Sequence, residues 1–149
     1  MTQLLSVLAL LGTGVVMGGF FAVAITIVPA LNAMPPDRYV YTHDLLGRYS
    51  DRVMPFLVLG SAVLGIALAV STAGTARWSF ALAAACMAGV MVVSRTRNVP
   101  LNRQVKRLRP EDIGPDWNDP RTRLRDWHLV RTVFAFAGCT LAAVGAVLA

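Results

Sequence analysis

Apolar residues dominate four long stretches of this chain, and none of these stretches contains Asp, Glu, Lys or Arg. The charge-free stretches are residues 1–36, 53–76, 78–94 and 132–149. A helix needs about 20 predominantly apolar residues to cross the hydrocarbon core of a bilayer. The pattern therefore predicts four transmembrane helices near residues 4–31, 53–73, 78–97 and 124–148, separated on one side by loops at 32–52 and 98–123.

The composition points to the same class of protein. The 149 residues suit a single domain, 56% of them are apolar and only 15% are charged, against about 25% charged in an average soluble domain. A disordered chain is excluded, because such chains are poor in apolar residues. A secreted fold held together by disulfides is also excluded, because two cysteines form too few bonds for a chain of this length. The predicted fold is therefore all-α: one integral membrane domain, residues 1–149, built as a four-helix bundle.

The basic residues predict the orientation. Of the 14 Lys and Arg residues, all except Arg77 lie in or beside the loops at 32–52 and 98–123. Cytoplasmic loops carry an excess of basic residues, so both loops should be cytoplasmic and both termini outside. A basic rim beside anionic lipid explains the net charge of +6 without a nucleic acid partner. The compact loops lead us to expect a bacterial inner membrane.

The first loop carries a helical pattern of its own. After Pro35 and Pro36, the residues Tyr41, Leu45 and Tyr49 recur at helical spacing. Tyrosines are typical of the headgroup level of a membrane. The pattern predicts an amphipathic helix that lies in the membrane interface.

Small residues four positions apart occur in all four apolar stretches. Such pairs share a helix face and let two backbones approach closely in lipid. They favour a compact bundle within one chain and leave a homo-oligomer open. The pairs are Gly14 with Gly18, Ser61 with Gly65, Ala85 with Gly89, and Gly138 with Ala142.

A polar cluster is expected where the third and fourth helices meet the 98–123 loop. His128 and Arg131 are three residues apart and share a helix face, which Trp127 borders. Asn98 and Asn102, four residues apart, lie at the end of the third helix. These side chains can meet near the inner membrane boundary, and ionisable groups inside a membrane are candidates for function.

Each of these residues also has a structural explanation. Asn98 could cap a helix that begins at Pro100, and Arg131 could reach out to the lipid headgroups. Trp117 and Trp127 could be anchors in the aromatic belt. His128 alone could be a buried histidine with satisfied hydrogen bonds.

The run NVPLN at residues 98–102, the downstream Trp117 and the block WHLVRT at residues 127–132 resemble one family. The family consists of small four-helix membrane proteins whose named members are anthrone oxygenases of polyketide pathways. The first helix, with Ile27-Val28-Pro29-Ala30, is also similar. The resemblance implies oxidation of an anthrone to an anthraquinone by molecular oxygen, without flavin, haem or metal as a fixed part of the pattern. It also implies that Asn is allowed in place of His128.

The chemistry of that reaction assigns candidate roles. The site must bind a flat apolar phenol, remove one proton and stabilise the resulting oxyanion. His128 is the candidate general base. Arg131, with Asn98 and Asn102 as donors, would stabilise the enolate. Trp127, with Trp117 as a further substrate-binding residue, would stack on the rings.

Two alternatives stay open. A metal site with copper or iron could use the two histidines, His43 and His128, beside nearby carboxylates, although no ligand motif such as HExxH is present. A non-catalytic accessory subunit, or a lipid or solute binder, would leave the polar cluster structural. A dry bundle with Arg131 facing the headgroups would favour the accessory role.

Overall fold

The chain is helical almost throughout. The structure, a computed structural model, describes the backbone of every residue except 110, 112, 115 and 116, and the side chains of these residues except 49 and 50. The described residues contain no strand, so the predicted all-α class is confirmed. The elements are α1 (Thr2–Ala22), the π-helical turn η1 (Val23–Ile27), α2 (Val28–Ala33), α3 (Pro36–Ser71), α4 (Gly74–Val93), the π-helical turn η2 (Ser94–Asn98), α5 (Val99–Val105) and α6 (Arg121–Leu148).

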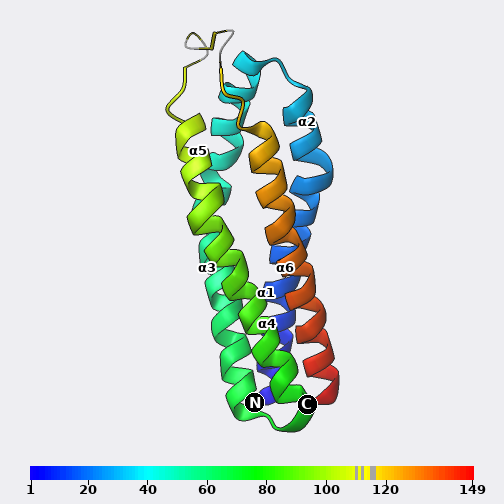
Figure 1. The fold of residues 1–149 in the computed structure, drawn as a ribbon. Coiled ribbons are helices and arrows are strands. Elements are labelled where there is room, and N and C mark those ends of the chain that lie inside the picture. The colour runs from blue at the N-terminus through cyan, green and yellow to red at the C-terminus, as the bar shows by residue number, and fades with distance from the viewer. Residues whose placement is uncertain (110, 112, 115–116) are drawn as a thin grey trace.

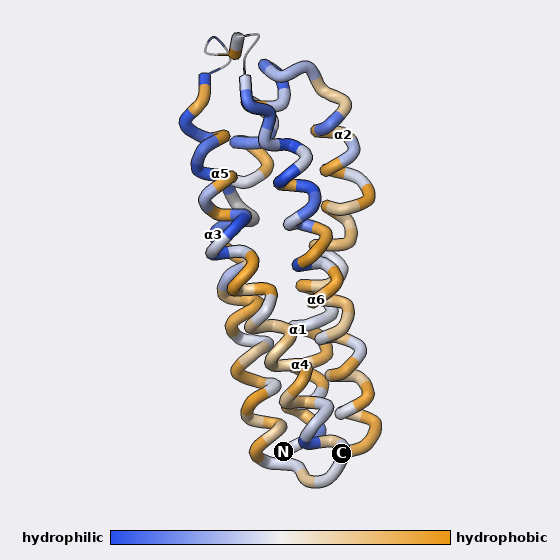
Figure 2. Tube along the Cα trace, viewed as in Figure 1, coloured by the Kyte–Doolittle hydropathy of each residue, from blue (hydrophilic) through white to orange (hydrophobic). Residues whose placement is uncertain are grey.

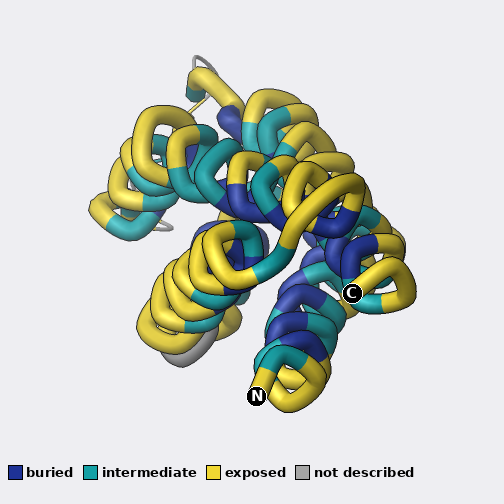
Figure 3. Tube along the Cα trace, turned by 90° about the horizontal axis from the view of Figure 1, so that it is seen from below, coloured by how far each residue is buried: buried dark blue, intermediate teal, exposed yellow. Residues whose placement is uncertain are grey.

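Four long rods form the predicted bundle. The first rod is α1 with η1 and α2, the second is α3, the third is α4 with η2 and α5, and the fourth is α6 (Figure 1). Both α1 and α4 pack against α3 and α6, which closes the bundle, and the buried positions turn inward (Figure 3). Both termini and the α3–α4 turn lie at one end (Figure 1). The α2–α3 turn, the end of α5 and the start of α6 lie at the other, which we call the basic end.

Each rod contains a segment that is long and apolar enough to cross a membrane. Large apolar side chains point outward from these segments, among them Leu11, Phe56 and Val133. Water disfavours such a surface, whereas lipid tails contact it readily. Hydrophilic positions gather at the basic end (Figure 2). The chain is therefore a multi-pass membrane protein, with spans within Thr2–Ala33, Asp51–Ser71, Gly74–Val105 and Arg121–Leu148.

Each π-helical turn is followed directly by a Val-Pro pair, with Pro29 after η1 and Pro100 after η2. Proline has no N–H to donate, and its ring clashes with a carbonyl of the preceding turn. A local π adjustment accommodates both effects, so a membrane helix can continue past the proline. The third rod accordingly runs on to Val105. The prediction that it ends at residue 97 and opens a loop at residue 98 is wrong.

The separate interfacial helix predicted in the first loop is also wrong. Residues 36–50 are the first turns of α3, which runs from Pro36 to Ser71 as one helix. Tyr39 in this segment is buried in an apolar cluster with residues of α2, α5 and the loop before α6. Because this packing ties the segment to the bundle, it continues the axis of the membrane helix instead of lying in the membrane plane. The only break between the first two rods is at Met34 and Pro35.

Glycines bring the rods together at three of the four predicted pairs. A Cβ atom at Gly65, Gly89 or Gly138 would lie 3.1, 3.0 or 2.5 Å, respectively, from a side chain of a neighbouring helix. Gly14 and Gly18 have no such atom within 4 Å, so the first pair makes no close approach within the described chain. Close backbone approach is what holds helices together in lipid.

Substitution of Gly65 by leucine is expected to destabilise the bundle by about 1–3 kcal/mol. The added side chain would press on the backbone around Ala84 and the carbonyl oxygen of Phe80, 3.3 Å from the Cβ position, and neither can move aside easily. The matched control is Gly60→Leu in the same helix, where the Cβ position is open. Thermal unfolding in detergent, followed by circular dichroism, should show a lower midpoint for G65L only. Equal midpoints for both variants would contradict this packing.

Candidate active site

A cavity of about 220 Å³ lies inside the basic end of the bundle. All four rods contribute to its wall, which has apolar residues on the side of α1 and α2, including Phe20, Ile27 and Leu31. The polar and charged residues of the wall are Tyr39, His43, Asp51, Asn98, Asn102, Arg121, Arg125, His128 and Arg131, with Asn32 beside them. The cavity thus combines an apolar side with a polar side, as small-molecule sites commonly do.

His128 is held at both of its ring nitrogens. Its Nε2 lies 2.9 Å from the carbonyl oxygen of Phe20, which can only accept a hydrogen bond. Its Nδ1 lies 3.0 Å from Nε and 2.8 Å from an Nη of Arg131, which can only donate. These partners fix a neutral ring with the proton on Nε2. His128 therefore has no free lone pair for the role of general base that the sequence suggested.

Arg131 faces the cavity and not the lipid headgroups. Its guanidinium donates to His128 and lies 4.5 Å from the centre of the Phe20 ring. Among the described residues it forms no ion pair with a carboxylate. A cation inside a membrane helix with no such partner is well prepared to bind an anionic group. The accessory-subunit alternative expects Arg131 to face the headgroups, whereas here it lines the cavity.

Polar atoms without partners gather at the same place. Four buried side-chain atoms of the described residues lack a hydrogen bond. Three of them belong to residues of the cavity wall: the hydroxyl of Tyr39, Nδ1 of His43 and Oδ1 of Asn98. Buried polar groups are normally paired, and each exception calls for an explanation such as a bound ligand or water. Their convergence on one cavity makes it the candidate binding site.

Asn98 and Asn102 enter this site because η2 and α5 continue the third rod. Asn98 is 2% exposed and has helical backbone angles, and its side chain makes no capping bond. The alternative that Asn98 caps a helix beginning at Pro100 is therefore wrong. Asn102, one turn later, lines the same cavity as His43, and its side chain raises the pKa of that imidazole.

His43 comes from the first turns of α3. Burial lowers the pKa of this imidazole, and Lys106 lowers it further, whereas Asp51, Asn102 and Asp44 raise it in part. The ring is therefore neutral at physiological pH. An ion pair between Asp51 and Lys106, with an N–O distance of 2.9 Å, joins α3 to the end of α5 beside it.

Arg121 joins α6 to the α2–α3 turn at the cavity wall. It donates hydrogen bonds to the carbonyl oxygens of Met34 at 2.7 Å and Asn32 at 3.3 Å. Its guanidinium also lies over the rings of Tyr39 and Trp117, at 5.4 and 5.7 Å. Burial, followed by the charge of Asp119, raises the pKa of Tyr39, so its hydroxyl stays protonated.

The two predicted tryptophans do not line the cavity. Trp117 packs behind Tyr39, with ring centres 6.2 Å apart. Trp127 faces the third rod, where the guanidinium of Arg97 lies 4.9 Å from its ring centre. The aromatic rings that do line the cavity are those of Phe20 and Tyr39.

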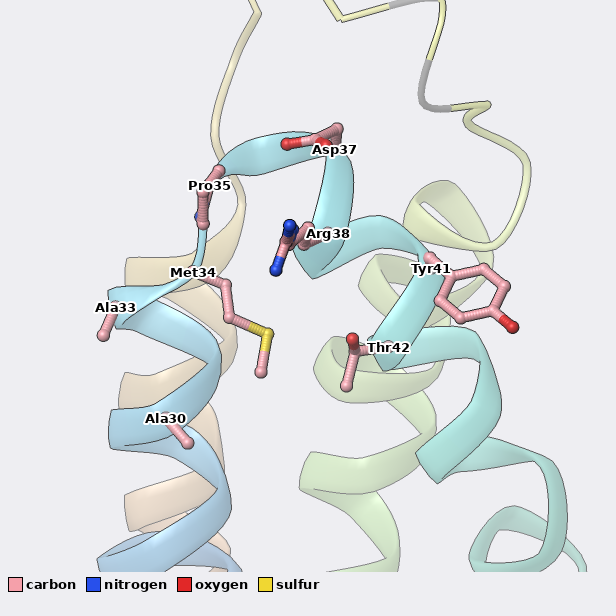
Figure 4. Close-up of a pocket in the computed structure, with 8 residues that line it drawn as sticks. All are labelled: Ala30, Ala33, Met34, Pro35, Asp37, Arg38, Tyr41 and Thr42. Carbon is pink, nitrogen blue, oxygen red and sulfur yellow. The ribbon is translucent and has the colours of Figure 1, made fainter.

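A second, more open hollow lies between α2 and α3 on the outside of the bundle. Figure 4 shows its lining, with Ala30 and Ala33 on one side and Tyr41 and Thr42 on the other. Its volume is about 630 Å³, larger than that of the inner cavity. None of the buried polar atoms without partners belongs to its lining. The candidate chemistry therefore lies in the inner cavity.

The side chains of the cavity can be tested against the alternative of a copper or iron site. His43 and His128 both line the cavity, as that alternative requires. The described residues contain no group of three or more His, Cys, Asp or Glu side chains placed to hold one ion. Both nitrogens of His128 are already engaged, so the residues present do not fit a two-histidine copper or iron centre.

The fold and the site define a class: a multi-pass four-helix membrane protein with a polar pocket at one end of the bundle. The model of the anthrone oxygenase family matches residues 45–141. The chain therefore belongs to the anthrone oxygenase family. No curated protein and no solved structure matches it.

Sequence reasoning missed several residues of the site. His43 was considered only as a metal ligand, and Tyr39, Asp51 and Arg121 were not singled out. Tyr39 and His43 are four residues apart and therefore share a helix face. This spacing is the signal in the sequence that points to these two residues. The predicted stripe of Tyr41 and Leu45 is exposed, and the side chain of its third residue, Tyr49, lies outside the described residues.

Proposed function

We propose that this protein is a membrane-embedded oxygenase that oxidises a flat phenolic substrate of the anthrone type with molecular oxygen. The observation that carries the proposal is made on the described part of the chain: a guanidinium without an ion pair, Arg131, and three unpartnered polar atoms gather around one half-apolar cavity. A cavity of about 150 Å³ is enough for benzene. The cavity here, about 220 Å³, suits a larger aromatic molecule.

The wall residues suggest how such a substrate would bind. The rings of Phe20 and Tyr39 would contact its aromatic faces. Arg131 would donate to the oxygen that becomes negative when the substrate loses its proton, with Asn98 and Asn102 as further polar partners. His128 acts in this proposal as a positioning residue. Its ring is held by the carbonyl oxygen of Phe20 and in turn accepts a hydrogen bond from Arg131, which orients the guanidinium.

The reaction needs no further oxidant. Loss of a proton from the methylene group gives an electron-rich enolate, which passes one electron to oxygen. Combination of the two radicals forms a carbon–oxygen bond, and a proton returns to give a hydroperoxide. Cleavage of the oxygen–oxygen bond with loss of the remaining hydrogen releases water and leaves the second carbonyl. One anthrone and one O₂ thus give one anthraquinone and one water, and we propose that no bound cofactor takes part.

The distribution of charge supports an orientation. Basic residues gather at the end that holds the cavity. Because cytoplasmic loops carry an excess of basic residues, we propose that this end is cytoplasmic and both termini are outside. We propose a bacterial inner membrane as the location. An apolar aromatic substrate and O₂ both concentrate in lipid, so a pocket at the membrane boundary can receive both. A homo-oligomer would be compatible with the outward-facing Gly14 and Gly18.

Oxygen uptake by the purified protein in detergent tests the proposal, with 1,8-dihydroxyanthrone as substrate. We expect uptake at least about tenfold faster than in protein-free detergent, with one quinone formed per O₂ consumed and no change on addition of a chelator. Loss of the rate with chelator would replace the cofactor-free reaction by a metal-dependent one. A rate equal to the spontaneous oxidation would refute anthrone oxidation and favour the binding or accessory alternatives.

A further inference from the structure

We propose that His43 is the general base of this site, the group that takes the proton from the substrate's methylene carbon. The inference rests on the proposed function and names a residue for its first step. The range of the family match begins at residue 45, so this assignment comes from the structure and not from the match.

The first argument is the state of the ring nitrogens. Nδ1 of His43 is buried and has no hydrogen-bond partner among the residues that the structure describes, whereas both nitrogens of His128 are engaged. The side chain of Asn102 also acts on this ring and raises its pKa. In the tautomer with the proton on Nε2, Nδ1 carries the lone pair and is open to a proton. His43 is thus the histidine of the cavity that can accept a proton.

The second argument is the charge around the ring. His43 lines the same cavity as Arg131, so the proton and the negative oxygen of the substrate would have separate partners. After the transfer, the imidazolium would be stabilised by Asn102 and by the carboxylates of Asp51 and Asp44. Burial and Lys106 act in the opposite direction and keep the ring neutral before the transfer. A base must be neutral at the start and able to bear charge afterwards, and this environment provides both.

The step balances without a co-reactant. The carbon–hydrogen bond of the methylene group breaks, its electron pair enters the enolate, and the proton binds Nδ1 of His43. No oxygen is needed for this half-reaction. It can therefore be measured in the absence of oxygen as exchange of the methylene protons with deuterium from D₂O.

The test is anaerobic deuterium exchange of 1,8-dihydroxyanthrone, followed by proton NMR and paired with aerobic oxygen uptake. We expect His43→Ala to lose about 10²-fold in both rates, and added imidazole to restore part of the loss, because the truncated side chain leaves room for it. His43→Asn, which stays polar but cannot act as a base at neutral pH, should be as slow and should not respond to imidazole. Tyr41→Ala, on the exposed side of the same helix, is the matched control and should equal the wild type.

The rates should also fall as the pH drops through the pKa of His43, which lies below its usual value of 6.5. Below that pH the ring is protonated and cannot accept. The other charged or titratable groups of the described residues at this wall are Asp44 and Asp51 on α3, Lys106 after α5, Arg121, Arg125, His128 and Arg131 on α6, and the hydroxyl of Tyr39. The fall of the rates at low pH should be absent in His43→Asn.

The outcomes separate this inference from the proposed function. A wild-type protein that accelerates both reactions, with H43A and H43N equally fast, overturns the role of His43 and leaves the oxygenase proposal standing. Variants that lose oxygen uptake but keep the exchange rate also overturn it, because the proton would then leave by another route. A wild-type protein that accelerates neither reaction overturns both proposals.

Discussion

Replacement of Arg131 by methionine should slow anthrone oxidation by about 10²–10³-fold, the usual cost of removing a donor to a developing oxyanion. Methionine replaces the apolar stem of the side chain but removes the charge and the donors. No carboxylate among the described residues would be left unpaired, since Arg131 pairs with none. The loss should fall mainly on kcat, because the negative charge on the substrate exists only after proton removal.

Steady-state oxygen uptake at several anthrone concentrations measures this effect. Arg123→Met is the matched control, because Arg123 is exposed on the same helix and should keep the wild-type rate. Arg131→Lys should lie between the wild type and R131M, since lysine restores the charge but not the two parallel donors. An unchanged kcat in R131M would show that the guanidinium does not stabilise the enolate.

The second large effect separates the two roles considered for His128. His128→Leu should lower the oxidation rate by about 10²-fold, because it leaves the Phe20 carbonyl and the Arg131 guanidinium without their shared partner. His128→Asn should stay within about tenfold of the wild type. The side-chain oxygen of asparagine can take the place of Nδ1 as acceptor for Arg131, although asparagine cannot act as a base at neutral pH.

Oxygen uptake by the two variants, with thermal unfolding as a check on folding, decides between the roles. A fast H128N and a slow H128L would identify His128 as a positioning residue. Two equally slow variants, both with the wild-type unfolding midpoint, would return His128 to the role of general base. The resemblance to the anthrone oxygenases, which implies that asparagine is tolerated at this position, agrees with the first outcome.

Part of the site followed from the sequence because its residues are close along the chain. Asn98 with Asn102 and His128 with Arg131 have helical spacing, so each pair was expected on one face. The third and fourth helices are consecutive, which predicted that the two pairs lie at the same depth. All four residues do line one cavity.

The part that was missed depends on which way a helix face turns. In a membrane protein both the core and the lipid are apolar, so periodicity alone does not tell an inward face from an outward one. Trp127 and His128 are adjacent in sequence, yet only His128 lines the cavity. Tyr39 and Tyr41 are two positions apart, and one is 2% exposed and the other 65%.

The sequence by itself determined the number of membrane helices, the polar end of the bundle and the family, because charge-free length and short local motifs carry that information. Only the tertiary structure decided that the first and third helices continue past their prolines. It also decided that residues 36–50 form the first turns of α3 and not a separate helix. It also decided which histidine keeps a free nitrogen. The physical reason is that a hydrogen bond such as that from His128 to Phe20 joins residues 108 positions apart, and no local pattern specifies such a partner.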